Sequence, residues 1–116
     1  MLEKSERPWG RYEVLQEGAT YKVKSIHVSP GKRLSYQRHQ KRSEHWYVTD
    51  GIGEVTLDGK VIKVLRGSII TVPQGCAHRM SNTGDTELIF IEVQTGSYFG
   101  EDDIERIEDD FGRYGR

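Results

Sequence analysis

The chain has 116 residues, with 17 basic and 18 acidic side chains and a net charge of −1. This length suits one domain around a single core, and the balanced charge favours neither nucleic acid nor a membrane surface as a partner. The sequence contains no apolar run long enough to span a bilayer and no signal-peptide pattern. A single cysteine, Cys76, excludes an internal disulfide and suits a reducing compartment. We therefore expect a cytoplasmic protein.

Residues 1–20 predict an extended N-terminal arm. Trp9 in this arm needs a pocket, which the second subunit of a homodimer could supply. From residue 21 to residue 95, short segments rich in β-branched and aromatic residues alternate with Gly, Pro, Asn and Asp, a pattern typical of an antiparallel all-β sandwich or barrel. Asp58-Gly59 predicts a two-residue hairpin turn, because both residues tolerate positive φ. The expected strands are Tyr21–Val28, Glu44–Thr49, Glu54–Leu57, Lys60–Val64, Ser68–Val72, Ala77–Ser81 and Leu88–Thr95.

The tail, residues 96–116, has a different pattern. Glu101 to Asp103 would suit a helix N-terminus, where the helix dipole favours negative charge. Ile104, Ile107 and Phe111 follow at positions that form one apolar stripe on a helix. The pattern predicts a short helix from about Glu101 to Asp110, docked on the barrel.

Two spaced patterns indicate a metal site. The first is Gly31-x5-Gln37-x-His39-x4-Glu44-x6-Gly51, and the second is Gly67-x5-Pro73-x-Gly75-x2-His78-x3-Asn82. Residues two apart on a strand point to the same face, so Gln37 and His39 are expected to project into one interior, with Glu44 on the next strand and His78 on a distant hairpin. Imidazole, carboxylate and amide ligands suit one divalent ion, zinc first, with manganese, cobalt, nickel or iron as alternatives. Gln37 has a second interpretation, as a residue that hydrogen-bonds a ligand instead of the metal.

These two patterns resemble the paired motifs of cupins, and the whole chain is similar to a narrower family. That family is the phosphomannose isomerase type II domain, the C-terminal part of bifunctional mannose-6-phosphate isomerase/mannose-1-phosphate guanylyltransferases. The resemblance implies a single cupin domain with a jelly-roll barrel, also called a double-stranded β-helix. It is carried by Arg7-Pro8-Trp9-Gly10, Gln37-x-His39, Arg42-Ser43-Glu44-His45-Trp46, Pro73-x-Gly75, Ile91-Glu92-Val93-Gln94, Glu101-Asp102-Asp103-Ile104 and Gly112-Arg113.

The resemblance implies isomerisation of mannose 6-phosphate to fructose 6-phosphate through an enediol. Such a reaction needs a group that moves a proton between C2 and C1, and Glu92 is our candidate. Strand parity puts Leu88, Phe90, Glu92 and Gln94 on one face, with the polar pair towards the barrel mouth. The alternative is that Glu92 only hydrogen-bonds the terminal helix or an arginine.

The phosphate of such a substrate needs cations. Arg106 and Arg113, in the terminal blocks of the resemblance, are the first candidates, and Lys24 is the next. Arg42 and Arg38 form a basic turn near the expected ligands and could serve instead. A solvated surface position is the alternative for each.

Two other functions remain open at this point. The first is a non-catalytic sugar or sugar-nucleotide binding module that works with a separate nucleotidyltransferase chain. The second is a metal-dependent dioxygenase, since cupins with His and Glu ligands can use iron and oxygen. No Gly-rich phosphate loop precedes a helix, so we do not expect this chain by itself to transfer GMP. Fold alone does not choose among these functions.

Overall fold

The protein, described over residues 3–100 and 102–113 by a computed structural model, is all-β, with eleven strands and no helix in those ranges. The strands are β1 (Lys4–Arg7), β2 (Gly10–Glu17), β3 (Tyr21–Val28), β4 (Tyr36–Arg38), β5 (Arg42–Asp50), β6 (Ile52–Leu57), β7 (Lys60–Leu65), β8 (Ile69–Val72), β9 (His78–Asn82), β10 (Leu88–Gly96) and β11 (Glu105–Glu108). No helix capable of spanning a membrane occurs in the part of the chain that the structure describes.

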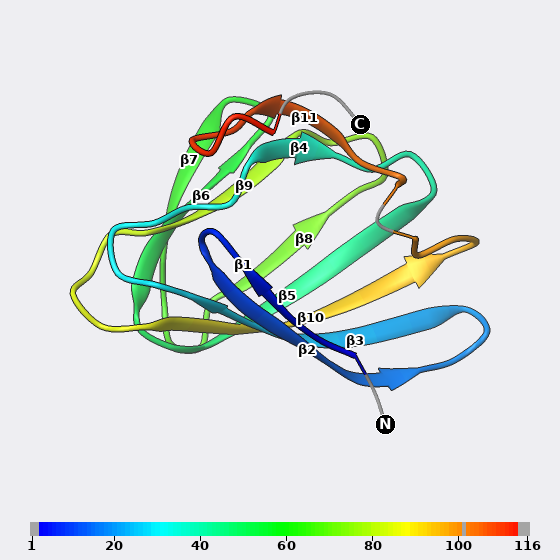
Figure 1. The fold of residues 1–116 in the computed structure, drawn as a ribbon, viewed down its shortest axis with the longest axis horizontal. Helices are drawn as coiled ribbons and strands as arrows, with labels where there is room; N and C mark the ends of the chain where they lie inside the picture. Colours follow the sequence, from blue (N-terminus) through cyan, green and yellow to red (C-terminus); the bar gives the residue numbers. More distant parts are fainter. Residues whose placement is uncertain (1–2, 101, 114–116) are drawn as a thin grey trace.

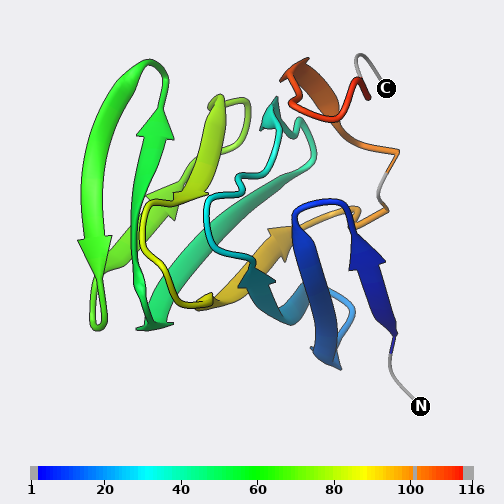
Figure 2. The same ribbon diagram turned by 60° about the vertical axis from the view of Figure 1, so that its left-hand side comes forward.

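The strands form two sheets that face each other across a shared core (Figures 1 and 2). One sheet has the order β1-β2-β3-β10-β5-β8, and the other has the order β11-β4-β9-β6-β7. The predicted turn at Asp58-Gly59 joins β6 to β7, and both residues have positive φ, 44° and 83°. The expectation of an antiparallel all-β sandwich is therefore confirmed.

The interior is apolar at one end and polar at the other, which places the site. Every second residue is buried from Arg42 to Val48 on β5 and from Leu88 to Gln94 on β10. The two strands pair so that Phe90 lies opposite Val48 while Gln94 lies opposite Glu44. The buried side chains of both strands are therefore apolar at one end of the interior and polar or charged at the other. The apolar cluster comprises Trp9, Tyr12, Val14, Ile26, Val28, Trp46, Val48, Val55, Val64, Ile70, Val72, Met80, Leu88 and Phe90.

The N-terminal segment folds onto its own chain. The predicted arm forms the β1–β2 hairpin, which extends the six-stranded sheet beyond β3. Trp9, in the turn between those strands, is only 6% exposed and belongs to the apolar cluster. The expectation that Trp9 needs a pocket on a second subunit is therefore wrong, because the chain buries this indole by itself.

The C-terminal helix expected over Glu101–Asp110 is not formed in its described part, and Glu101 itself lies outside the described residues. The segment is extended and contributes β11, which pairs with β4. Two tertiary interactions explain the difference. The backbone of β4 offers a sheet edge, and the Asp103 carboxylate accepts the N–H groups of Gln40 and Lys41 at 3.2 and 2.9 Å. These bonds outweigh the weak local preference of a short helix.

Candidate functional site

Three of the four predicted metal ligands meet inside the barrel. His39 directly follows β4, Glu44 lies on β5 and His78 begins β9, and their ligand atoms all lie within 4.8 Å of one another. All three side chains are at most 4% exposed. Glu44 lies between the imidazoles, with Oε2 3.7 Å from His39 Nδ1 and Oε1 3.9 Å from His78 Nε2.

The donor set fits a divalent metal ion. His39 Nδ1 and His78 Nε2 are buried and have no hydrogen-bond partner, and these are the ring nitrogens nearest Glu44. His78 Nδ1 lies 3.0 Å from the Cys76 carbonyl oxygen, so Nδ1 carries the proton and Nε2 keeps its lone pair for a ligand bond. The residues therefore offer two nitrogens and a carboxylate to one point.

Burial keeps both imidazoles neutral. Desolvation, followed by the nearby charge of Arg42, lowers the pKa of His39 to about 2. Desolvation also lowers the pKa of His78, although the Cys76 carbonyl opposes this shift. A neutral imidazole is the form that binds metal.

Gln37, the fourth predicted ligand, lies close by on β4, where it pairs with His78 of β9. Its Oε1 accepts a hydrogen bond from Ser35 Oγ at 2.6 Å. Metal ligation by Gln37 stays a prediction. The Ser35 hydroxyl already occupies this oxygen as a hydrogen-bond partner, but the same hydrogen bond could also hold the oxygen in place for a metal ion.

Arg42 lies within the cluster of predicted ligands. Its Nε donates to Glu44 Oε2 at 2.9 Å, and its Nη2 lies 2.9 Å from His39 Nε2. The side chain is as buried as the two groups it contacts. Arg42 is therefore placed to influence both predicted ligands.

Glu92 faces the same interior from β10, as strand parity predicted. Its Oε2 accepts a hydrogen bond from Gln94 Nε2 at 2.6 Å. Burial, followed by the negative charge of Glu44, raises the pKa of Glu92 to about 8, and Lys24 and Arg42 partly oppose that shift. A carboxyl group that titrates near neutral pH is suited to exchanging protons.

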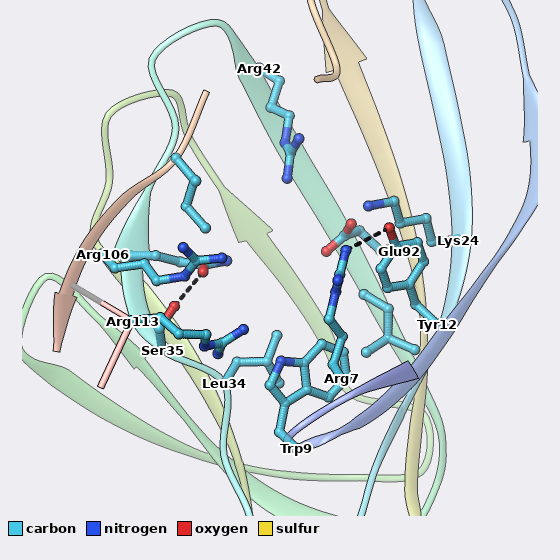
Figure 3. Close-up of a pocket in the computed structure, with 13 residues that line it drawn as sticks. Arg7, Trp9, Tyr12, Lys24, Leu34, Ser35, Arg42, Glu92, Arg106 and Arg113 are labelled. Atoms are coloured by element: carbon cyan, nitrogen blue, oxygen red, sulfur yellow. Dashed lines mark hydrogen bonds between the residues drawn. The ribbon is translucent and has the colours of Figure 1, made fainter. Parts of the chain in front are cut away.

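A small open pocket lies beside this cluster (Figure 3). Glu92, Gln37 and Arg42 line it together with Ser35 and four further cations. The complete lining is Arg7, Trp9, Tyr12, Lys24, Ile26, Leu34, Ser35, Gln37, Arg42, Glu92, Ile104, Arg106 and Arg113. Five cationic side chains and one carboxyl group around a single pocket suit an anionic ligand.

The pocket draws its cations from distant parts of the chain. Arg106 comes from β11, and Arg113 follows it and pairs with Asp109 at 2.8 Å. Lys24, from β3, lies over the Tyr12 ring, 4.2 Å from its centroid. Figure 3 shows that the Arg7 and Arg42 side chains enter the space between the two arginines, Arg106 and Arg113, and Lys24. Arg38 is not among the lining residues, and its Nε pairs with Glu105 at 3.2 Å instead.

Sequence reasoning missed Arg7 and Tyr12 as site residues. Arg7 donates to the Tyr12 hydroxyl at 3.2 Å, and both side chains line the pocket. The signal was present in the Arg7-Pro8-Trp9-Gly10 block. It was not used because a terminal arm carries no information about which cavity it reaches.

Comparison with known proteins agrees with this architecture. Residues 1–109 match the family described as "Mannose-6-phosphate isomerase C-terminal". The alginate biosynthesis protein AlgA of Pseudomonas aeruginosa is 48% identical over 107 residues, which cover 92% of this chain and 22% of AlgA. The mannose-1-phosphate guanylyltransferase ManC of Salmonella typhimurium is 45% identical with the same coverage. The chain therefore spans about a fifth of the length of these relatives.

Solved structures show the same fold at low identity. A cupin-2 domain from Rhodospirillum rubrum has a TM-score of 0.73 and 18% identity, covering 88% of this chain and 78% of that one. The capsular polysaccharide assembling protein CapF of Staphylococcus aureus has a TM-score of 0.78 and 19% identity, covering 93% and 32%. The fold is thus that of a cupin, and the chain belongs to the mannose-6-phosphate isomerase C-terminal family.

Proposed function

We propose that this domain is a metal-dependent aldose–ketose isomerase that interconverts mannose 6-phosphate and fructose 6-phosphate. One observation carries the proposal: the buried carboxyl group of Glu92 lies beside the His39–Glu44–His78 cluster and also lines the cation-rich pocket. A phosphorylated sugar in this pocket would therefore meet a proton-transfer group and a possible metal centre at once. The family to which the chain belongs supports the same chemistry.

Glu92 is the group that would move the proton. Its raised pKa, caused first by burial and then by the charge of Glu44, brings its titration near physiological pH. General acid–base groups work best when their pKa lies near the operating pH. In its ionised form, the Glu92 carboxylate would take the proton from one carbon of the substrate, and the resulting carboxylic acid would return it to the neighbouring carbon.

The cations would hold the phosphate group and so fix the sugar. Arg106 and Arg113 approach the pocket from the C-terminal segment, and Arg7 and Lys24 approach it from the N-terminal half of the chain. Guanidinium groups bind phosphate through charge-assisted hydrogen bonds. A substrate anchored in this way would keep its reacting carbons at one distance from Glu92.

His39, Glu44 and His78 would hold the metal, with Gln37 as a possible fourth ligand. A bound divalent ion supplies Lewis-acid polarisation of the substrate carbonyl in such a site. Trp46 lies against His78, 5.6 Å between ring centroids, and against Phe90, 4.9 Å between ring centroids, so buried aromatic rings border the cluster on one side.

The test is a coupled assay that detects fructose 6-phosphate, run on zinc-loaded protein of known metal content. The expected result is metal-dependent turnover, which is lost in His78→Ala together with the metal. Glu92→Gln should keep the metal and lose roughly 10²–10⁴-fold in kcat. Folded, metal-loaded protein that turns over no mannose 6-phosphate would contradict the proposal.

That negative result would favour the second candidate, a sugar or sugar-nucleotide binding module acting with a nucleotidyltransferase. Its support is that ManC, which the chain covers only in part, is called a mannose-1-phosphate guanylyltransferase. Mannose 6-phosphate or a sugar nucleotide would then bind at the cationic pocket without conversion, as calorimetry would detect. Iron(II)-dependent oxygen uptake would instead indicate the dioxygenase. A homodimer remains an expectation from the resemblance alone, and sedimentation would test it.

A further inference from the structure

Arg42 makes two contacts that no substrate-binding role requires. Its Nε donates to Glu44 Oε2 and its Nη2 lies against His39 Nε2, each at 2.9 Å. The three side chains are buried together, and Arg42 also lines the cation-rich pocket. One guanidinium group thus touches two predicted metal ligands and the predicted anion site.

The contact with His39 excludes metal binding by the same imidazole. A neutral imidazole has one lone pair, and a ring nitrogen that accepts a hydrogen bond is using it. If Nε2 accepts from Arg42, then Nδ1, which faces Glu44, carries the proton and cannot be a ligand. If Nδ1 binds a metal ion, Nε2 carries the proton and cannot accept from Arg42. If Nε2 binds the metal ion, the guanidinium must move away.

The positive charge of Arg42 also opposes metal binding. A guanidinium 2.9 Å from the carboxylate of Glu44 compensates the negative charge that a divalent ion needs. The pocket offers the guanidinium another environment, because an anion there would supply acceptor oxygens in place of His39 and Glu44.

We propose that Arg42 couples the two sites: its guanidinium blocks the metal centre in the absence of an anion, and an oxyanion in the pocket draws it away. Metal and anion then bind with positive cooperativity, and each raises the affinity for the other by the same factor. The inference rests on the metal centre of the proposed function. It does not require isomerase turnover.

The test measures metal affinity with cobalt(II), followed by its visible absorption, with and without sulfate at constant ionic strength. Sulfate represents the tetrahedral oxyanion. In the wild-type protein, saturating sulfate should raise the cobalt affinity roughly tenfold. Arg42→Met should bind cobalt about tenfold more tightly than the wild type without sulfate, and sulfate should no longer change that affinity.

Arg7→Met is the matched control, because it removes a guanidinium from the same pocket that does not contact His39 or Glu44. This variant should need more sulfate and should show the wild-type gain in cobalt affinity at saturation. If sulfate fails equally in Arg7→Met and Arg42→Met to raise the cobalt affinity, the coupling comes from the overall positive charge of the pocket. That result would overturn the proposal.

A second measurement needs only the wild-type chain and covers the case in which Arg42→Met does not fold. The ¹⁵N resonance of Arg42 Nε should shift when zinc is added, since its partner Glu44 would become a ligand. An unchanged resonance with zinc bound would overturn the inference and leave the metal centre intact. Failure to bind any metal would overturn both, whereas coupled binding without turnover would remove only the isomerase proposal.

Discussion

Trp46 donates a hydrogen bond from its indole Nε1 to Glu44 Oε1 at 2.9 Å, and both side chains belong to the buried face of β5. The indole thereby fixes one carboxylate oxygen, while Arg42 contacts the other. The Trp46 ring also lies against His78, 5.6 Å between centroids. One strand therefore supplies a metal-ligand candidate and the residue that orients it.

Trp46→Phe tests that orientation. Phenylalanine keeps an aromatic ring beside Phe90 and removes the N–H donor. Glu44 Oε1 therefore loses the hydrogen bond that holds it in place. We expect metal affinity to fall about 10- to 100-fold, the range found when a group that orients a ligand is lost. Cobalt titration measures this, and urea unfolding of the same sample shows whether the variant is folded. Unchanged affinity in a folded variant would contradict the assigned role.

Protonation of Glu92 predicts how the stability of the metal-free protein depends on pH. Its pKa is about 8 in the folded chain, against an ordinary value of 4.5, so between these values the folded state holds a proton that the unfolded state has lost. Stability therefore falls as pH rises through this window. His39 acts in the opposite sense, because its pKa of about 2 lies below its ordinary 6.5, and its contribution rises with pH until 6.5.

Above pH 6.5, Glu92 is the one of these two groups whose contribution to stability still changes with pH. The metal-free protein should lose up to about 2 kcal/mol of unfolding free energy between pH 6.5 and pH 8. Urea unfolding in the presence of a chelator at both pH values measures the loss. Glu92→Gln carries no titrating proton there and should show a smaller difference, and equal differences in the two proteins would exclude Glu92 as the source.

Arg106→Met should weaken binding of a phosphorylated sugar. Arg106 lines the pocket from β11, where it lies opposite Gln37 of β4. Loss of one charge-assisted hydrogen bond should raise KM for mannose 6-phosphate roughly 10- to 150-fold, with a smaller change in kcat because the group is remote from the reacting carbons. Arg66→Met, an exposed change of the same charge, is the control. A KM that changes equally in both variants would exclude a specific contact.

Asp103→Ala should destabilise the domain. The carboxylate accepts the backbone N–H groups of Gln40 and Lys41, next to His39, and each donor left unpaired costs about 1–3 kcal/mol if it stays buried. Thermal unfolding should show a clear drop relative to Asp85→Ala, which removes an exposed carboxylate. Identical midpoints for the two variants would mean that water replaces Asp103 without cost.

The patterns in the sequence predicted the central strands well because those strands satisfy local and tertiary preferences at once. The alternation Leu88, Phe90, Glu92, Gln94 correctly predicted which side chains of β10 point inward. Asp58-Gly59 predicted its turn because both residues tolerate the positive φ that a two-residue hairpin needs. The spacing of His39, Glu44 and His78 correctly brought three groups to one point.

The terminal segments could not be read in this way. Ile104, Ile107 and Phe111 have helical spacing. The segment nevertheless forms strand β11, because the edge of β4 is available for pairing and Asp103 accepts backbone hydrogen bonds. The sequence indicates that the apolar Trp9 side chain needs burial. Only the folded β1–β2 hairpin shows that this chain buries it without a second subunit.

By itself, then, the sequence determined the all-β class, the grouping of His39, Glu44 and His78 and the inward face of β10, because strand period and side-chain chemistry are local properties. Only the tertiary structure decided which cations share a pocket with Glu92, and that His39, at the end of β4, meets the Arg42 and Glu44 side chains of β5 in the other sheet. These contacts join residues whose spacing in the chain follows no repeating pattern. They depend on how two sheets and two terminal segments pack together, which no local periodicity records.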